Sequence, residues 1–107
     1  MTTFQDREKA FEDKYKHDQD LQFKVEVRRN KLLGLWIAEE FLGRSGAEAD
    51  SYAKEVVTAD FEEPGDADLL RKIFGDLEKQ GVELSEHRLR KKMDELTVEA
   101  KQQIMTE

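Results

Sequence analysis

The sequence predicts an all-α protein: a four-helix bundle with a long first helix and a projecting, partly disordered N-terminal arm. Apolar residues recur at helical spacing in four segments, and no segment shows the sustained alternation of apolar and polar residues that is typical of a strand. The strongest helix-breaking positions fall between these segments, at Gly43 and Gly46, at Pro64 and Gly65, and at Gly81.

The first segment runs from about Thr3 to Leu42, and Thr3 with Asp6 resembles a helix-capping box. A single helix of this length would approach about 60 Å, which is more than three shorter helices can cover. Residues 1–20 hold only two of the 26 Leu, Ile, Val and Phe residues. We therefore expect residues 1–20 to form the arm and residues 21–107 to form the bundle domain. One helical face carries Phe4, Phe11, Tyr15, Val25, Leu32 and Trp36.

Three shorter helices are expected after the first: from about Ala47 to Asp60, from Asp66 to Gly81, and from Ser85 onward. Asp66 and Ser85 are favourable N-cap residues, and Gly81 suits the left-handed position that ends a helix. The expected apolar faces are Tyr52, Ala53, Val56 and Val57; Leu69, Leu70, Ile73, Phe74 and Leu77; and Leu89, Met93, Leu96, Ala100 and Ile104.

Gly34 lies inside the apolar part of the first helix, where glycine lowers helix propensity. Either a neighbouring helix approaches closely at this point, or the site merely tolerates a weak helix former. The sequence leaves both readings open.

Charge and composition restrict the class of protein. Eighteen basic and 25 acidic side chains give a net charge of −7, and residues 45–68, with eight acids and one base, account for the whole imbalance. Such a chain lacks general affinity for nucleic acid or anionic membranes. It has no apolar stretch long enough for a membrane span and no signal-peptide pattern. We expect a cytoplasmic bacterial protein with no nucleic-acid partner and no direct membrane insertion.

No catalytic or metal-binding motif is evident. The chain has no cysteine, nucleophile elbow or glycine-rich phosphate loop, and His17 and His87 lack a convergent set of further ligands. Residues 60–68 imitate a calcium loop, but Pro64 and Arg71 occupy positions that should supply oxygen ligands. We interpret this segment as an acidic turn between helices, and we expect neither an enzyme nor a metal or cofactor site.

Two basic clusters stand out against the acidic background. One contains Arg28, Arg29 and Lys31, and the other contains Arg88, Arg90, Lys91 and Lys92. Such clusters are usually solvated helix faces paired with neighbouring acids. A nucleotide phosphate or another anion is the alternative ligand, and it stays open as a minor hypothesis.

The N-terminal arm is the sharpest functional feature. Phe4, Phe11 and Tyr15 share one helical face, while charges of both signs cover the remainder. This pattern suits a helix that inserts into a protein groove through aromatic anchors. The competing interpretation is that the same rings fold back onto the bundle.

Several sequence blocks along the chain carry a family resemblance. They are Thr2-Thr3-Phe4, Asp6-Arg7-Glu8, Phe11-Glu12, Arg28-Arg29-Asn30-Lys31-Leu32-Leu33-Gly34-Leu35-Trp36, Tyr52-Ala53-Lys54-Glu55-Val56-Val57, Ala59-Asp60-Phe61-Glu62-Glu63-Pro64-Gly65 and Lys92-Met93-Asp94-Glu95-Leu96. With these blocks in the same order, nearly the whole chain resembles the zeta subunit family of α-proteobacteria, inhibitors of the F-type ATP synthase, also known as a domain of unknown function.

The resemblance implies a four-helix bundle whose N-terminal segment, here Thr2 to about Lys16, inhibits ATP hydrolysis. That segment would insert at a catalytic α/β interface of the ATP synthase head, beside the rotor shaft formed by the gamma subunit, as a one-way block. The protein would be a monomer when free and peripheral at the inner face of the cell membrane when bound. The implied anchors are Phe4, Phe11 and Tyr15, and the implied polar contacts are Asp6, Arg7, Glu8, Lys9, Glu12 and Lys14.

Family members differ in inhibitory strength, and this arm keeps the Phe-x-Asp-Arg-Glu start together with an aromatic residue at position 11. Retained inhibition is therefore the expected function. The alternative is a small helical nucleotide-binding or adaptor domain whose arm does not inhibit.

Overall fold

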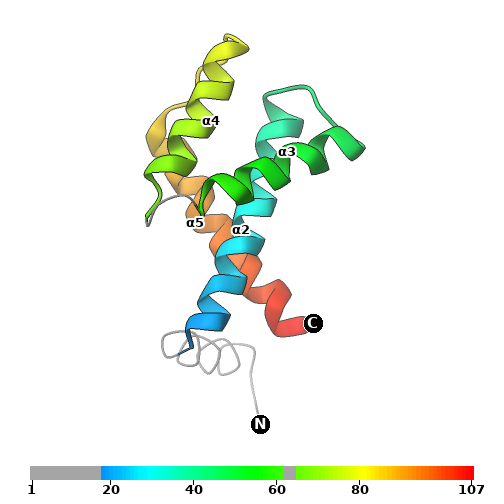
Figure 1. Ribbon diagram of the computed structural model, residues 1–107, viewed down its shortest axis with the longest axis vertical. Coiled ribbons are helices and arrows are strands. Elements are labelled where there is room, and N and C mark those ends of the chain that lie inside the picture. The colour runs from blue at the N-terminus through cyan, green and yellow to red at the C-terminus, as the bar shows by residue number, and fades with distance from the viewer. Residues whose placement is uncertain (1–17, 62–64) are drawn as a thin grey trace.

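The computed structural model describes residues 18–61 and 65–107, and within these ranges the chain forms four helices and no strand (Figure 1). This confirms the predicted all-α fold with four helices. The expectations for residues 1–17, including the Thr3 cap and the projecting arm, lie outside the described residues. The helices are α2 (Gln19–Glu40), α3 (Gly46–Ala59), α4 (Ala67–Lys79) and α5 (Glu86–Thr106).

Helix α2 begins at Gln19, close to the boundary at which the sequence predicted that the arm ends and the bundle begins. The residue before it, Asp18, has an extended backbone with φ of −120° and ψ of 104°. Its carboxylate accepts hydrogen bonds from the amides of Asp20 at 3.0 Å and Leu21 at 3.2 Å. Asp18 therefore acts as an N-cap, which satisfies amide groups that have no partner inside the helix.

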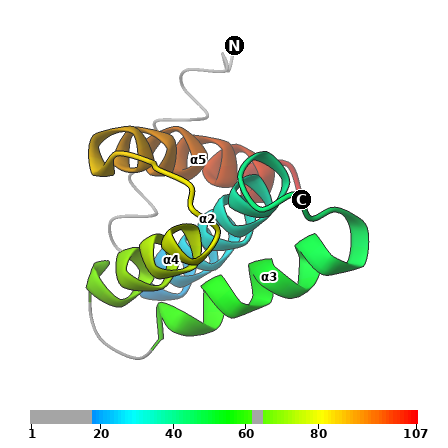
Figure 2. The same ribbon diagram turned by 90° about the horizontal axis from the view of Figure 1, so that it is seen from above.

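Helix α2 is the central element, with α3 and α5 both packed against it (Figure 2). Helices α2 and α5 run antiparallel, because Arg28 reaches Gln103 near the end of α5 while Trp36 lies beside Lys92 near its start. Helix α4 follows α3 and contacts it, and it contributes residues such as Leu69 to the same hydrophobic core.

The core confirms most of the predicted apolar faces of α3, α4 and α5, although Val57, Phe74 and Ile104 are only partly buried. The face of α2 differs from the prediction. Val25 is buried as expected, but Leu32 and Trp36 only border the core. Because α2 is packed between α3 and α5, its buried surface is wider than one stripe. Its buried residues are Val25, Asn30, Leu33, Gly34, Ile37 and Ala38.

Gly34 lies where α2 and α3 approach each other. A Cβ atom built on Gly34 would lie 2.6 Å from the Cα atom of Ala53 and 3.3 Å from the Cβ atom of Val56. The first distance is shorter than atoms of these types tolerate, and it involves backbone. Of the two readings that the sequence left open, the structure therefore supports close helix approach.

Polar groups join α3 to α4 at the edge of the core. The buried Tyr52 hydroxyl donates a hydrogen bond to Asp76 Oδ2 at 2.9 Å, and Lys72 Nζ lies 3.0 Å from the same oxygen. Lys72 also pairs with Glu55 at 3.3 Å. Burial and the hydrogen bond to Asp76 raise the pKa of Tyr52 above its ordinary value. Burial lowers the pKa of Lys72, but the bonds to Asp76 and Glu55 outweigh it, so that the net pKa is raised.

The helix ends follow the sequence signals with one exception. Ser85 Oγ accepts a hydrogen bond from the Arg88 amide at 3.1 Å. Gly81 has a φ of 70°, and the Val82 amide bonds to the Leu77 carbonyl at 2.9 Å, which closes the end of α4. Asp66 occupies the N-cap position of α4, but its side chain makes no capping hydrogen bond. Its φ of −99° and ψ of 0° differ from the extended geometry of a capping residue.

We predict that Gly34→Ala lowers the free energy of unfolding by about 1–2 kcal/mol, although alanine favours helices by about 1 kcal/mol, because α3 must move away from the added methyl group. The measurement is urea unfolding followed by circular dichroism. Gly75→Ala is the matched control: Gly75 is also inside a helix, but nothing lies within 4 Å of an added Cβ atom. That variant should gain up to about 1 kcal/mol. A stabilised Gly34→Ala protein would contradict the close approach.

We predict that Tyr52→Phe lowers the free energy of unfolding by about 1–2 kcal/mol at neutral pH, through loss of the bond to Asp76. Because folding raises the pKa of Tyr52, the hydroxyl contributes fully below its ordinary pKa near 10, and this contribution declines as the pH rises above that value. The difference between the two proteins should therefore shrink above pH 10. Urea midpoints at pH 8 and pH 11 measure it, and an equal difference at both pH values would refute the assignment.

Candidate functional site

The residues expected to contact the partner belong to the N-terminal arm. All of them precede Asp18 and lie outside the described residues, so their roles stay predictions. The structure does describe the end of the bundle that the arm joins, where α2 begins at Gln19. The expected contacts are Phe4, Asp6, Arg7, Glu8, Lys9, Phe11, Glu12, Lys14 and Tyr15.

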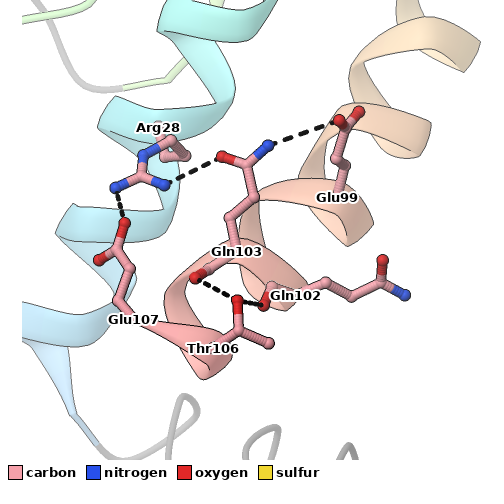
Figure 3. A network of polar contacts seen from close by, with 6 residues as sticks. All are labelled: Arg28, Glu99, Gln102, Gln103, Thr106 and Glu107. Atoms are coloured by element: carbon pink, nitrogen blue, oxygen red, sulfur yellow. Dashed lines mark hydrogen bonds and ion pairs between the residues drawn. The ribbon is translucent and has the colours of Figure 1, made fainter.

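At this end of the bundle, a polar network ties the last turns of α5 to α2 (Figure 3). Arg28 Nη1 donates a hydrogen bond to Gln103 Oε1 at 2.9 Å, and the other guanidinium nitrogen pairs with the Glu107 carboxylate. Gln103 Nε2 donates in turn to Glu99 at 3.4 Å. These contacts hold the C-terminal end of α5 beside the first half of α2.

Two exposed aromatic side chains lie at the same end of the bundle. Phe23 of α2 and Phe61, which follows α3, stack with ring centroids 5.5 Å apart and planes at 18°. Phe23 is 53% exposed and Phe61 is 55% exposed. Within residues 18–61 and 65–107, the only other large apolar side chain of comparable exposure is Val98, at 47%. We call Phe23 and Phe61 the aromatic pair.

Sequence reasoning missed the aromatic pair. Phe23 does not belong to the apolar stripe predicted for the first helix, and Phe61 stands among acids in a predicted turn. A large aromatic residue outside the apolar face of its helix was the available signal. The sequence alone did not show that the two rings meet.

Buried polar contacts determine where Phe61 lies. Asn30 is 1% exposed, and its Nδ2 donates a hydrogen bond to Asp60 Oδ2 at 2.8 Å. The Asn30 Oδ1 atom accepts from Arg29 Nε at 3.1 Å, and Arg29 also pairs with Asp66 at 3.6 Å. Asp60 and Asp66, on either side of the turn between α3 and α4, are thus held against α2.

An apolar groove of about 300 Å³ adjoins the aromatic pair and lies between α2 and the end of α5. Phe23, Val27 and Ile104 supply its apolar walls, and Arg28 and Glu107 contribute polar atoms. Val27 also lines a second groove, between α2 and α3, together with Val57. Partly covered apolar surface therefore continues from Phe23 along both sides of α2.

The first basic cluster is mostly engaged within the chain. Arg28 binds Gln103 and Glu107, and Arg29 binds Asn30 and Asp66. Lys31 is exposed on the rim of the groove between α2 and α3.

The second basic cluster lies at the other end of the α2–α5 pair. The Arg88 guanidinium lies 5.5 Å from the centre of the Phe41 ring. Arg90 pairs with Glu86 at 3.6 Å, and Lys92 pairs with Glu95 at 3.8 Å. Lys91 is exposed. Arg28 of the first cluster binds Gln103 of α5. Arg88 of the second cluster lies about 22 Å from Gln103 along the same helix. The two clusters therefore do not form one anion pocket, and nucleotide binding by either stays a prediction.

In the part of the chain that the structure describes, no three His, Cys, Asp or Glu residues lie together so that they could hold a metal ion. The calcium-like segment is described only in part, because residues 62–64 lie outside the described ranges. In this segment, Asp60 binds Asn30 and Asp66 pairs with Arg29. Asp68 pairs with Arg71 at 2.6 Å. These contacts agree with an acidic turn between helices. No helix of the described ranges is long and apolar enough to cross a membrane.

Comparison with known proteins places this architecture in a family. A solved structure, a solution NMR structure, is 52% identical to this chain with a TM-score of 0.71, and the match covers 80% of this chain and 96% of the other. No curated protein sequence matches. The family model of the ATPase inhibitor subunit zeta matches residues 1–103. Because this match spans nearly the whole chain, the protein belongs to the ATPase inhibitor subunit zeta family.

Proposed function

We propose that this protein inhibits ATP hydrolysis by the F-type ATP synthase and that its N-terminal segment, Thr2 to about Lys16, is the inhibitory element. The observation that carries the proposal is the match of residues 1–103 to an ATPase inhibitor family, because this match includes the whole arm. The arm inserts at a catalytic α/β interface of the enzyme head beside the rotor shaft, where it blocks hydrolytic rotation and permits rotation in the synthesis direction.

The distribution of the core supports a division of labour between arm and bundle. Among the described residues, the buried apolar side chains lie between Val25 and Ala100, and α2 has its own N-cap at Asp18. The packed helices of the described residues therefore all follow Asp18, beyond the proposed inhibitory segment. The aromatic residues Phe4, Phe11 and Tyr15 precede this cap, and the proposal assigns them to the partner.

The chemistry of the arm suits a protein groove. If residues 4–15 are helical when bound, the three aromatic side chains share one face and charged side chains cover the others. A segment that becomes ordered on binding loses conformational entropy, so its affinity must come from a few well-buried anchors. Aromatic residues fulfil this role because they bury large areas at small entropic cost.

The partners are the alpha, beta and gamma subunits of the catalytic head. The protein acts in the bacterial cytoplasm, is a monomer when free, and becomes peripheral to the inner face of the cell membrane through the enzyme. It performs no catalysis of its own in this proposal.

We predict that deletion of residues 1–16 abolishes inhibition of ATP hydrolysis and leaves the bundle folded, because the buried apolar side chains of the described residues begin at Val25. The measurement is hydrolysis by the isolated head of the enzyme from the source organism, titrated with full-length and shortened protein. Helical circular dichroism and the melting temperature of the shortened protein provide the control for folding. Inhibition by the shortened protein at the same concentration as the full chain would disprove the role of the arm.

We predict that Phe11→Ala weakens binding to the enzyme head by about 1–3 kcal/mol, because it removes a buried anchor. The matched control is Asp13→Ala, which is outside the predicted contact set and, two residues from Phe11, would lie on the opposite side of the bound helix that the proposal expects. Half-inhibitory concentrations of both variants measure the effect. Equal potency of Phe11→Ala and the unaltered protein would mean that another residue is the anchor.

A further inference from the structure

We infer that the aromatic pair, Phe23 and Phe61, is a second binding surface for the head of the ATP synthase. The aromatic pair docks into an apolar pocket with a basic rim. This pocket lies on the alpha or beta subunit to which the arm binds. This inference rests on the proposed function and extends the contact from the arm to the folded bundle.

The first argument is exposure. Both rings remain more than half exposed although they stack on each other, at 53% for Phe23 and 55% for Phe61. They come from different elements, so they form one apolar patch at the end of the bundle, continuous with the groove that contains Val27 and Ile104. Single exposed apolar residues need no explanation, whereas a contiguous aromatic patch is typical of an interaction site.

The second argument is rigidity. The buried Asn30 side chain binds Asp60, the residue before Phe61, and the Phe61 amide donates to the Thr58 carbonyl at 3.1 Å. Phe23 is part of α2, whose start is capped by Asp18. The backbone that carries each ring is thus fixed before any partner binds, and the two rings stack on each other. Binding through such preorganised rings avoids much of the entropic cost of ordering side chains.

The third argument is position. Phe23 lies four residues after Gln19, where α2 begins, which is about 6 Å along the helix axis. A partner that holds the arm must lie beside this end of the bundle. The aromatic pair is therefore among the first folded surfaces that the partner meets beyond the arm.

The fourth argument is charge. The segment 45–68, which contains Phe61, carries eight acids and one base. Asp60 and Asp66 are the described acids nearest to Phe61 in sequence, and α2 places Asp20 close to Phe23. Lys24 and Arg28 line the groove beside Phe23, so the acidic part of this surface is the side of Phe61. A pocket rimmed with lysine or arginine on the side that faces Phe61 complements these acids, which favours the correct orientation and speeds association.

The experiment compares the full chain with Phe23→Ser, Phe61→Ser and the double variant in the hydrolysis assay. The expected result for the double variant is a tenfold or larger rise in the half-inhibitory concentration, with an unchanged helical circular dichroism spectrum because neither ring belongs to the hydrophobic core. Val98→Ser is the matched control, since Val98 is 47% exposed on α5 and lines neither groove beside the aromatic pair. It should inhibit like the unaltered protein.

A second measurement detects the contact directly. A photoreactive phenylalanine analogue replaces Phe23 in the full chain, and a second protein carries it in place of Val98. Irradiation of each with the enzyme head should cross-link position 23, but not position 98, to the alpha or beta subunit.

The outcomes separate this inference from the proposed function. If the unaltered protein inhibits, the double variant inhibits equally well and position 23 does not cross-link, the second surface is wrong while the inhibitory arm stands. If the unaltered protein does not inhibit, both fail. Cross-linking of position 23 to the protein's own arm, or a dimer of the free protein that the double variant abolishes, would show a different occupant and overturn the inference.

Discussion

The close contact between α2 and α3 at Gly34 is the constraint on which the rest of the bundle depends. Because Gly34 has no side chain, the backbone of α3 at Ala53 comes near the axis of α2, and Val56 is buried against it. The same register brings Asp60, one residue beyond α3, within hydrogen-bond distance of Asn30. A larger residue at position 34 would separate the helices and disturb both contacts.

Some acidic residues of the described segments do more than add negative charge. They stabilise the fold through hydrogen bonds and ion pairs with specific partners. Asp60 binds Asn30, Asp66 pairs with Arg29, and Asp76 binds both Tyr52 and Lys72. Among the described residues, no buried side-chain nitrogen or oxygen lacks a hydrogen-bond partner. The excess of acids in residues 45–68 therefore combines two roles: some carboxylates join helices, and the remainder give this side of the protein its negative surface.

The sequence predicted the buried residues of some helices better than those of others. Most of the core residues of α3, α4 and α5 followed from a single apolar stripe on each helix, because each of these helices has one principal buried face. Helix α2 is packed by two neighbours, so Leu33 and Ile37 are buried where the sequence indicated Leu32 and Trp36. The capping bond expected of Asp66 is also absent, since its backbone lacks the extended geometry that a capping side chain requires. The roles of the arm residues stay predictions.

The sequence by itself determined that the protein is all-α, where its helices break, and which family it resembles, because periodicity, glycine and proline positions and ordered motif blocks are local properties of the chain. Only the tertiary structure decided that Gly34 marks a close helix contact, that Arg28 binds the end of α5, and that Phe23 stacks on Phe61. These contacts join residues far apart in the chain. They depend on how the helices cross, which the apolar pattern of any single helix does not specify.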